Sequence, residues 1–205
     1  MSRFLNARYA GLTAYTPGEQ PRDRQYIKLN TNESPYPPSP AVLAALDRQD
    51  VADLRLYSDP EGTALRAALA RRYGVTPGQV FLSNGSDDIL NFAFMAFGAD
   101  GAVFPGLTYS FYPVFADLHQ VAYETVPLAE DFSIDPAALA GRGKLTVLAN
   151  PNAPTGLALS LDQVEAIVAA DPAHVVVVDE AYVDFGADSA ASLVDRYDNL
   201  PVDMT

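Results

Sequence analysis

Four consecutive valines at residues 175–178 are the feature that most constrains the fold of this chain. A run of β-branched residues is typical of a strand buried on both faces, the usual state of a parallel strand in an α/β sheet. Two carboxylates, Asp179 and Glu180, follow the valines directly. Because an unpaired charge is costly to bury, a carboxylate at this point needs either solvent or a cationic partner.

Strand-like and helix-like segments alternate along most of the chain. Short apolar runs predict strands at residues 80–83, 101–105, 121–128, 144–150 and 174–180. The spacing of apolar residues and helix stop signals predict helices at residues 40–50, 62–73, 86–97, 108–120, 135–141, 159–171 and 189–199. The alternation implies an α/β fold, in which a mostly parallel sheet carries helices on both faces. Residues 1–40 are rich in proline and predict an irregular N-terminal arm.

The composition argues against several classes of partner. A formal net charge of −13 over 205 residues disfavours binding to nucleic acid or to an anionic membrane. The chain has no cysteine, which excludes disulfides and thiolate metal sites, and its two histidines, His119 and His174, show no ligand spacing. No stretch has the apolar length of a membrane span, and the first residues lack the apolar core of a signal peptide. We therefore expect a cytoplasmic protein without a metal site.

Polar residues follow three of the predicted strands. They are residues 84–87 (Asn-Gly-Ser-Asp), residues 150–152 (Asn-Pro-Asn) and the pair Asp179 and Glu180. Ligands of open α/β sheets bind beyond the carboxyl ends of the strands, so three polar strand ends suggest one shared site. Residues 84–87 fit two interpretations: a turn in which Ser86 caps the next helix, or an anion site at the N-terminus of that helix.

Four tyrosines lie in predicted loops or at the ends of predicted elements, namely Tyr15, Tyr57, Tyr109 and Tyr182. Most tyrosines in such places are half-buried packing residues whose hydroxyl reaches water. A planar aromatic ligand would give several of them a function. The sequence pattern alone leaves both interpretations open.

An apolar strand that ends in Asp-Glu also occurs in nucleotide hydrolases. Those proteins need an upstream GxxxxGK[ST] loop, whose backbone N–H groups bind phosphates. The nearest stretch is at residues 141–145, where Gly143 and Lys144 could match the GK of the motif. Ala138 then stands where the first glycine should be, and Leu145 stands where the hydroxyl residue should be. It also precedes a strand instead of a helix, so a nucleotide hydrolase is disfavoured. The chain contains no GxSxG motif of a serine hydrolase either.

Several stretches together resemble a known family. They are LNTNESPYPPSP, LYSDPEGTALRAALARRYGV, NGSDDILNFAFMAF, PGLTYSFYPVFADL, ANPNAPTGLALS and VVVVDEAYVDFG, in this order along the chain. They resemble the N-terminal portion of the class I/II pyridoxal-phosphate-dependent aminotransferases, which have the aspartate-aminotransferase fold (fold type I). The DEAY and PTG elements are shared widely in that family, whereas LNTNESPY and YSDPEGT are similar to its histidinol-phosphate aminotransferase group. The resemblance implies that residues 41–205 form an incomplete large domain that binds pyridoxal 5′-phosphate.

The resemblance also implies roles for individual residues around the cofactor. Asp179 would hold the proton on the pyridine nitrogen, Tyr182 would donate to the phenolate oxygen, and Tyr109 would stack on the ring. The cofactor phosphate would lie at the N-terminus of the helix that begins near Gly85, Ser86 and Asp87. Residues near the dimer partner or the substrate complete the set: Tyr57, which would reach the partner's cofactor phosphate, and Tyr15 and Asn32, which would border the substrate.

Two positions depart from the family pattern. Many relatives have an asparagine directly before PTG, where this chain has Ala153, and we expect Asn152 to take over its role toward the cofactor. The catalytic lysine that forms the Schiff base has no counterpart, because neither Lys28 nor Lys144 lies in the matching motif. We expect this lysine just beyond Thr205, and we expect the small C-terminal domain to be absent from the chain as given.

The function that the resemblance implies is transfer of an amino group between L-histidinol phosphate and 2-oxoglutarate, in histidine biosynthesis. The enzyme would be a homodimer with shared active sites and would act on small molecules. Two alternatives stay within the same scaffold: an aromatic amino acid transaminase and a decarboxylase of a phosphorylated amino acid. A third applies if the chain truly ends at Thr205, because it would then be a non-catalytic cofactor-binding fragment.

Overall fold

The structure is a computed structural model that describes residues 9, 19, 23–24, 26–27, 29–30, 32–46 and 55–204. The chain divides into two units, Met1–Glu61 and Gly62–Thr205. The described part of the first unit contains one α-helix, α1 (Pro40–Leu46), which lies within the predicted helix at residues 40–50. The arm predicted for residues 1–40 belongs to this unit, and its boundary at residue 40 stays a prediction.

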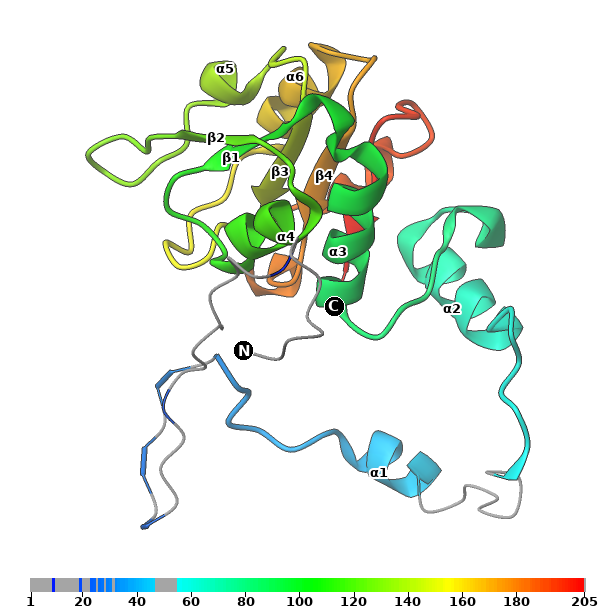
Figure 1. Cartoon of the computed structure of the whole chain (residues 1–205). Coiled ribbons are helices and arrows are strands. Elements are labelled where there is room, and N and C mark those ends of the chain that lie inside the picture. The colour runs from blue at the N-terminus through cyan, green and yellow to red at the C-terminus, as the bar shows by residue number, and fades with distance from the viewer. Residues whose placement is uncertain are drawn as a thin grey trace. The chain divides into compact units, whose positions relative to one another are not determined.

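The second unit is built on a five-stranded parallel sheet (Figure 1). The strand order is β2-β1-β3-β4-β5, and every neighbouring pair is parallel. The predicted parallel α/β sheet is therefore confirmed. The strands are β1 (Ala102–Pro105), β2 (Tyr123–Val126), β3 (Leu145–Ala149), β4 (Val176–Asp179) and β5 (Val202–Asp203).

Helices connect the strands of this sheet, and five of the predicted helices in this unit are present. Pro113 is tolerated in α4 because the N–H groups of a first helical turn have no partner within the helix. The α-helices are α2 (Thr63–Tyr73), α3 (Ser86–Phe97), α4 (Phe111–His119), α5 (Pro136–Leu139) and α6 (Leu161–Ala169). Short 3₁₀ helices are η3 (Pro77–Gln79), η4 (Gly98–Asp100), η5 (Val183–Phe185) and η6 (Ala190–Leu193).

The core lies on both faces of the sheet. Along β4, Val176 and Val178 pack with α5, α6 and η6, whereas Val177 packs with α3 and α4 (Figure 1). This alternation follows from the two-residue period of a strand. All four residues of β4 are buried, as the valine run predicts. By the same period Asp179 points to the α3 and α4 face, and Glu180 points to the opposite face.

Two predicted elements are wrong. Residues 80–83 form no strand, because no neighbouring strand among the described residues supplies a hydrogen-bonded ladder for them. Residues 189–199 contain only the 3₁₀ helix η6, not an α-helix. The side chain of Ser189 accepts from Ala191 N, and Asn199 Nδ2 donates to three carbonyls of the α6–β4 region. These contacts hold the segment in turns instead of a continuous helix.

None of the helices in the described part of the chain is long and apolar enough to cross a membrane.

Candidate active site

The carboxyl edge of the sheet brings the three polar clusters of the sequence together with α3 and α4. Asp179 ends β4, Asn152 lies in the loop after β3, and α3 begins near the same edge at Ser86. Hydrogen bonds join these segments, as shown below. The predicted convergence of polar strand ends is therefore a feature of the fold.

Asp179 is a buried carboxylate, 5% exposed, and two donors of the chain bind it. The hydroxyl of Tyr112 donates to Oδ2 at 2.8 Å, and the backbone N–H of Ala181 donates to Oδ1 at 3.2 Å. Burial raises the pKa of Asp179, and these two hydrogen bonds oppose that rise. The carboxylate is thus fixed in orientation at the end of a strand, where a cationic ligand would stabilise its charged form.

Glu180 has a different environment from its neighbour. Its carboxylate accepts hydrogen bonds of 2.6 Å from the hydroxyl of Ser189 and from the backbone N–H of Ala190. Burial raises the pKa of Glu180, while these two donors lower it. Glu180 therefore anchors the start of η6 on the other face of the sheet, and its role is structural.

The N-terminus of α3 is open to a ligand. Gly85 is the N-cap residue with φ 81°, and no side chain caps the helix. A Cβ atom placed on Gly85 would meet nothing within 4 Å. Ser86 is the first helical residue and does not cap it, which favours the anion interpretation of residues 84–87 over the capping interpretation. Free N–H groups and the helix dipole both favour a negative ligand here.

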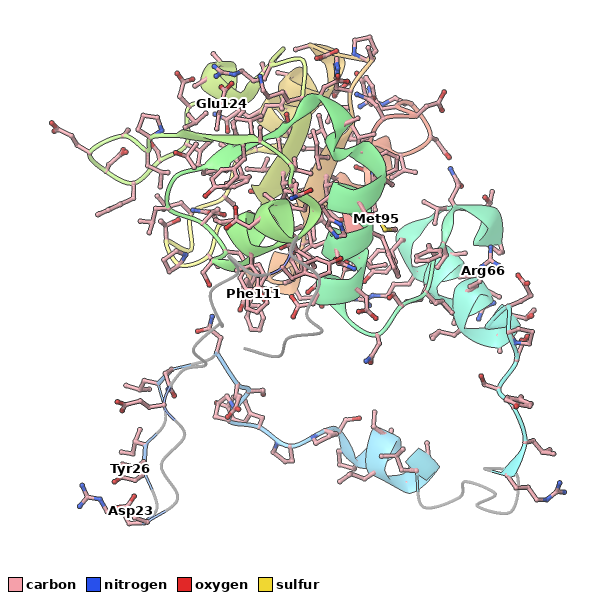
Figure 2. The ribbon with its side chains drawn as sticks, viewed as in Figure 1. Asp23, Tyr26, Arg66, Met95, Phe111 and Glu124 are labelled. Atoms are coloured by element: carbon pink, nitrogen blue, oxygen red, sulfur yellow. The ribbon has the colours of Figure 1, made fainter. Side chains whose placement is uncertain are left out.

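Tyr109 lies beside this helix terminus. Its hydroxyl donates to Asp87 Oδ1 at 2.9 Å. Its ring is stacked on that of Phe111, with centroids 5.7 Å apart, and meets the ring of Tyr112 edge-on at 5.7 Å. Figure 2 labels Phe111 at the start of α4. The structure thus brings Tyr109 next to Asp87 at the N-terminus of α3.

Asn152 is buried and fully engaged by the chain. Its Nδ2 donates to Leu107 O at 3.0 Å and to Thr155 Oγ1 at 3.2 Å. Its Oδ1 accepts from the hydroxyl of Thr108 at 2.7 Å. These bonds tie the loop after β3 to the segment before α4, which fixes the position of Tyr109. A direct contact of Asn152 with a cofactor, in place of the asparagine replaced by Ala153, stays a prediction.

The remaining predicted site residues lie in other segments of the chain, or outside the part of the chain that the structure describes. Tyr182 is half-buried after β4, where it precedes η5 and its ring lies 6.4 Å from that of Phe185. Tyr57 is fully exposed, Asn32 has φ 52°, and both belong to the first unit. Tyr15 lies outside the described residues. The roles of these four residues stay predictions.

Sequence reasoning missed two residues of this site. Tyr112 is fully buried, and its hydroxyl donates to Asp179. Burial raises the pKa of Tyr112 well above its usual value, and the neighbouring Asp179 carboxylate raises it further. Asp203 pairs in register with Asp179 on the neighbouring strand β5 and is 4% exposed. An acidic residue among the apolar neighbours Val202 and Met204 is the signal that could have identified Asp203.

An apolar cavity of about 750 Å³ lies beside this edge of the sheet. Apolar side chains of α2, α3 and residues 75–82 form most of its wall, and Gly85 and Asp203 are part of it. Among the described residues, no group of histidine, aspartate and glutamate side chains could hold a metal ion. The site therefore offers an anion position at α3 and a carboxylate at Asp179, joined by aromatic rings.

Comparisons with known proteins agree with this geometry. The model of the family "aminotransferase class I and II" matches residues 24–204. Histidinol-phosphate aminotransferase 2 of Dechloromonas aromatica is 54% identical over 98% of this chain, and the histidinol-phosphate aminotransferase of Syntrophus aciditrophicus is 50% identical over 98%. In both cases the match spans 58% of the relative.

A solved structure shares the fold. The histidinol-phosphate aminotransferase of Sinorhizobium meliloti, solved in complex with pyridoxal-5′-phosphate, superimposes with a TM-score of 0.75 and 30% identity. The match covers 85% of this chain and 50% of that one. This chain thus spans little more than half the length of the relatives it matches. With the family model covering most of its residues, the chain belongs to the class I and II aminotransferases.

Proposed function

We propose that the protein carrying this chain transfers an amino group between L-histidinol phosphate and 2-oxoglutarate, with pyridoxal 5′-phosphate as cofactor. Sequence identities of 54% and 50% to the two relatives named above support this substrate, since the names of both relatives carry that activity. The step would belong to histidine biosynthesis. The chain spans 58% of the length of those relatives. The activity is therefore proposed for the whole protein that carries this chain.

One observation carries this proposal: a buried carboxylate and an open helix N-terminus face the same end of the sheet. The residues fit the two charged ends of the cofactor, a phosphate and a protonated pyridine nitrogen. The N-terminus of α3, without a side-chain cap and with open space at Gly85, suits the phosphate. Asp179, held by Tyr112, suits the ring nitrogen.

When bound, pyridoxal phosphate supplies an electron sink that works while its ring nitrogen is protonated. Asp179 would keep the proton on that nitrogen. Tyr109 would stack on the ring, and Asn152 and Tyr182 would act near its phenolate oxygen. Ser86 and Asp87 would present the helix terminus to the phosphate. Tyr57 would contact the cofactor phosphate of the partner subunit. Tyr15 and Asn32 would border the substrate.

The proposal extends to the assembly and its location. We expect a cytoplasmic homodimer with shared active sites, acting on small molecules and binding neither nucleic acid nor membrane. The high negative charge of the chain supports the last two points. Of the two lysines in the chain, Lys28 lies outside the described residues, and Lys144 directly precedes β3 and pairs with Glu124 at 3.0 Å, so the catalytic lysine is not among the described residues of the site.

A substrate panel tests this proposal. The purified protein is assayed with 2-oxoglutarate and one of three amino donors: L-histidinol phosphate, an aromatic amino acid or a phosphorylated amino acid. We expect glutamate to form with L-histidinol phosphate at a kcat/KM at least about tenfold above that with the other donors, a difference of about 1.4 kcal/mol. Preference for the aromatic donor, or release of CO₂ without any oxo acid, would replace the proposed substrate by one of the two alternatives.

A further inference from the structure

Asp203 is a buried acid that the transamination proposal does not use. It lies on β5, opposite Asp179 in the parallel register, so both side chains point to the same face of the sheet. Its side chain is almost completely buried, and its Oδ2 has no hydrogen-bond partner among the described residues. A buried carboxyl oxygen without a partner is costly, and such a group in a native site calls for an explanation.

The charged side chains that act on Asp203 among the described residues are both acidic. Asp179 on β4 and Asp87 on α3 both repel its negative form, and Tyr112 on α4 faces the same space. None of the ion pairs among the described residues includes Asp87, Asp179 or Asp203. Desolvation and this repulsion raise the pKa of Asp203 to about 7. Without a bound cation, the protonated form of Asp203 is therefore favoured below about pH 7.

A metal ion does not account for these carboxylates, since the described side chains form no metal-binding group. A single organic cation does. Asp203 is part of the wall of the 750 Å³ cavity, as is Gly85 at the start of α3. Because Asp203 is opposite Asp179 in the register of β4 and β5, a cationic ring bound next to Asp179 would lie near both carboxylates.

We propose that Asp203 is a second acidic positioning residue of the cofactor site, which holds its proton when no cofactor is bound and releases it when a protonated pyridine ring binds beside Asp179. The inference rests on the proposed cofactor. The O–H bond of the Asp203 carboxyl group breaks, its proton passes to solvent, and the ring keeps its own proton. The net charge of Asp179, Asp203 and the ring nitrogen is −1 before binding and −1 after it, so the buried charge stays constant.

Titration of the purified protein with pyridoxal phosphate between pH 6 and pH 8 tests this inference. The affinity of the wild type is divided by that of Asp203→Asn, so that the cofactor's own ionisations cancel. The ratio is expected to rise about tenfold from pH 6 to pH 8, because the wild type must lose a proton to bind at the lower pH. The control is Asp198→Asn, which changes an exposed acid in the segment before β5. The affinity of the wild type divided by that of Asp198→Asn should be one at every pH.

The possible outcomes separate the two proposals. A ratio that is independent of pH overturns the role of Asp203 and leaves the proposed function standing. Failure of the wild type to bind pyridoxal phosphate at any pH overturns the proposed function itself. If Asp203→Asn does not fold, Asp203→Ala provides the same comparison, because it also removes the titrating group.

Discussion

At the scale of single residues, the site is organised around one carboxylate that the fold keeps away from water. Asp179 ends a strand that is buried on both faces, yet it receives two hydrogen bonds, from Tyr112 and from the backbone of Ala181. These donors stabilise its charged form without neutralising it. The carboxylate is thereby oriented before any ligand arrives, which reduces the reorganisation that binding requires.

Tyr112→Phe should destabilise the protein by about 1–3 kcal/mol, because it removes the hydroxyl donor from a buried carboxylate and leaves Oδ2 of Asp179 without it. Urea unfolding measures this change. The matched control is Tyr197→Phe, because the Tyr197 hydroxyl donates to Glu165 in a partly exposed place and its loss should cost less than about 1 kcal/mol. Equal costs for the two variants would contradict the claim that the Tyr112 hydroxyl stabilises a buried carboxylate more strongly than the Tyr197 hydroxyl stabilises Glu165.

Asp203→Asn should stabilise the protein without cofactor, and increasingly so as the pH rises. The pKa of Asp203 is raised from 3.8 to about 7 on folding, so the folded chain keeps a proton that the unfolded chain has lost. The free energy of unfolding therefore falls between about pH 4 and pH 7 in the wild type, and this contribution disappears in the variant. Thermal or urea unfolding at pH 5 and pH 7 should show a larger gain at pH 7. A gain of the same size at both pH values would argue against a titrating Asp203.

Much of the site could be predicted from the sequence, because its residues belong to short local motifs. The strand that ends in Asp179 and the turn at Gly85 can be recognised from neighbouring residues alone. Tyr112 and Asp203 could not, since their roles depend on how α4 packs on the sheet and on the register of β5 against β4. Both are long-range features that local spacing does not encode.

At the scale of elements, tight connections place the strands so that their carboxyl ends meet. Gly101 directly precedes β1 and has φ 93°, and its amide donates to Gly98 O at 3.0 Å. A Cβ atom at this position would lie 2.7 Å from the carbonyl oxygen of Ala122. The turn between η4 and β1 thus depends on the absence of a side chain.

Gly101→Ala should therefore destabilise the protein by about 1–3 kcal/mol, from backbone strain together with the collision with Ala122. Chemical unfolding of the purified variant measures the change. Gly78→Ala is the control, because its added Cβ would meet only the Thr76 hydroxyl at 3.9 Å and its φ is not positive. If both substitutions had small effects of similar size, the close approach of Gly101 to Ala122 would be wrong.

The elements that were predicted correctly carry a periodic signal of their own. Helix α3 matches its predicted residues 86–97, and β4 lies within its predicted range because of the valine run. Residues 80–83 are apolar enough for a strand, but a strand also needs a partner with free backbone groups. Residues 189–199 have helical spacing, but tertiary hydrogen bonds from Ser189 and Asn199 determine their conformation.

At the scale of the whole molecule, the chain spans 58% of the length of the named relatives, and an apolar cavity lies beside β5. Phe81, 71% exposed, is among the apolar side chains that line this cavity. Burial of such surface would contribute roughly 25 cal/mol per Å².

The protein should be a dimer, since the proposed site takes Tyr57 from a partner subunit. Sedimentation equilibrium on the purified protein is expected to give twice the mass of one chain at micromolar concentration. Tyr57→Phe should keep that mass and weaken the binding of pyridoxal phosphate, because it removes the hydroxyl that we propose contacts the phosphate. A monomer that binds pyridoxal phosphate with full affinity would contradict the shared site.

The most direct test of the account is the affinity for pyridoxal phosphate of the wild type, Asp179→Asn and Asp198→Asn, followed by the absorbance of the cofactor at pH 7.5. We predict that the wild type and Asp198→Asn bind equally and that Asp179→Asn binds at least about 30-fold more weakly, which corresponds to about 2 kcal/mol for the lost charge pair. If Asp179→Asn bound the cofactor as tightly as the wild type, the buried carboxylate at the end of β4 would not be the partner of the ring, and the proposed site would be wrong.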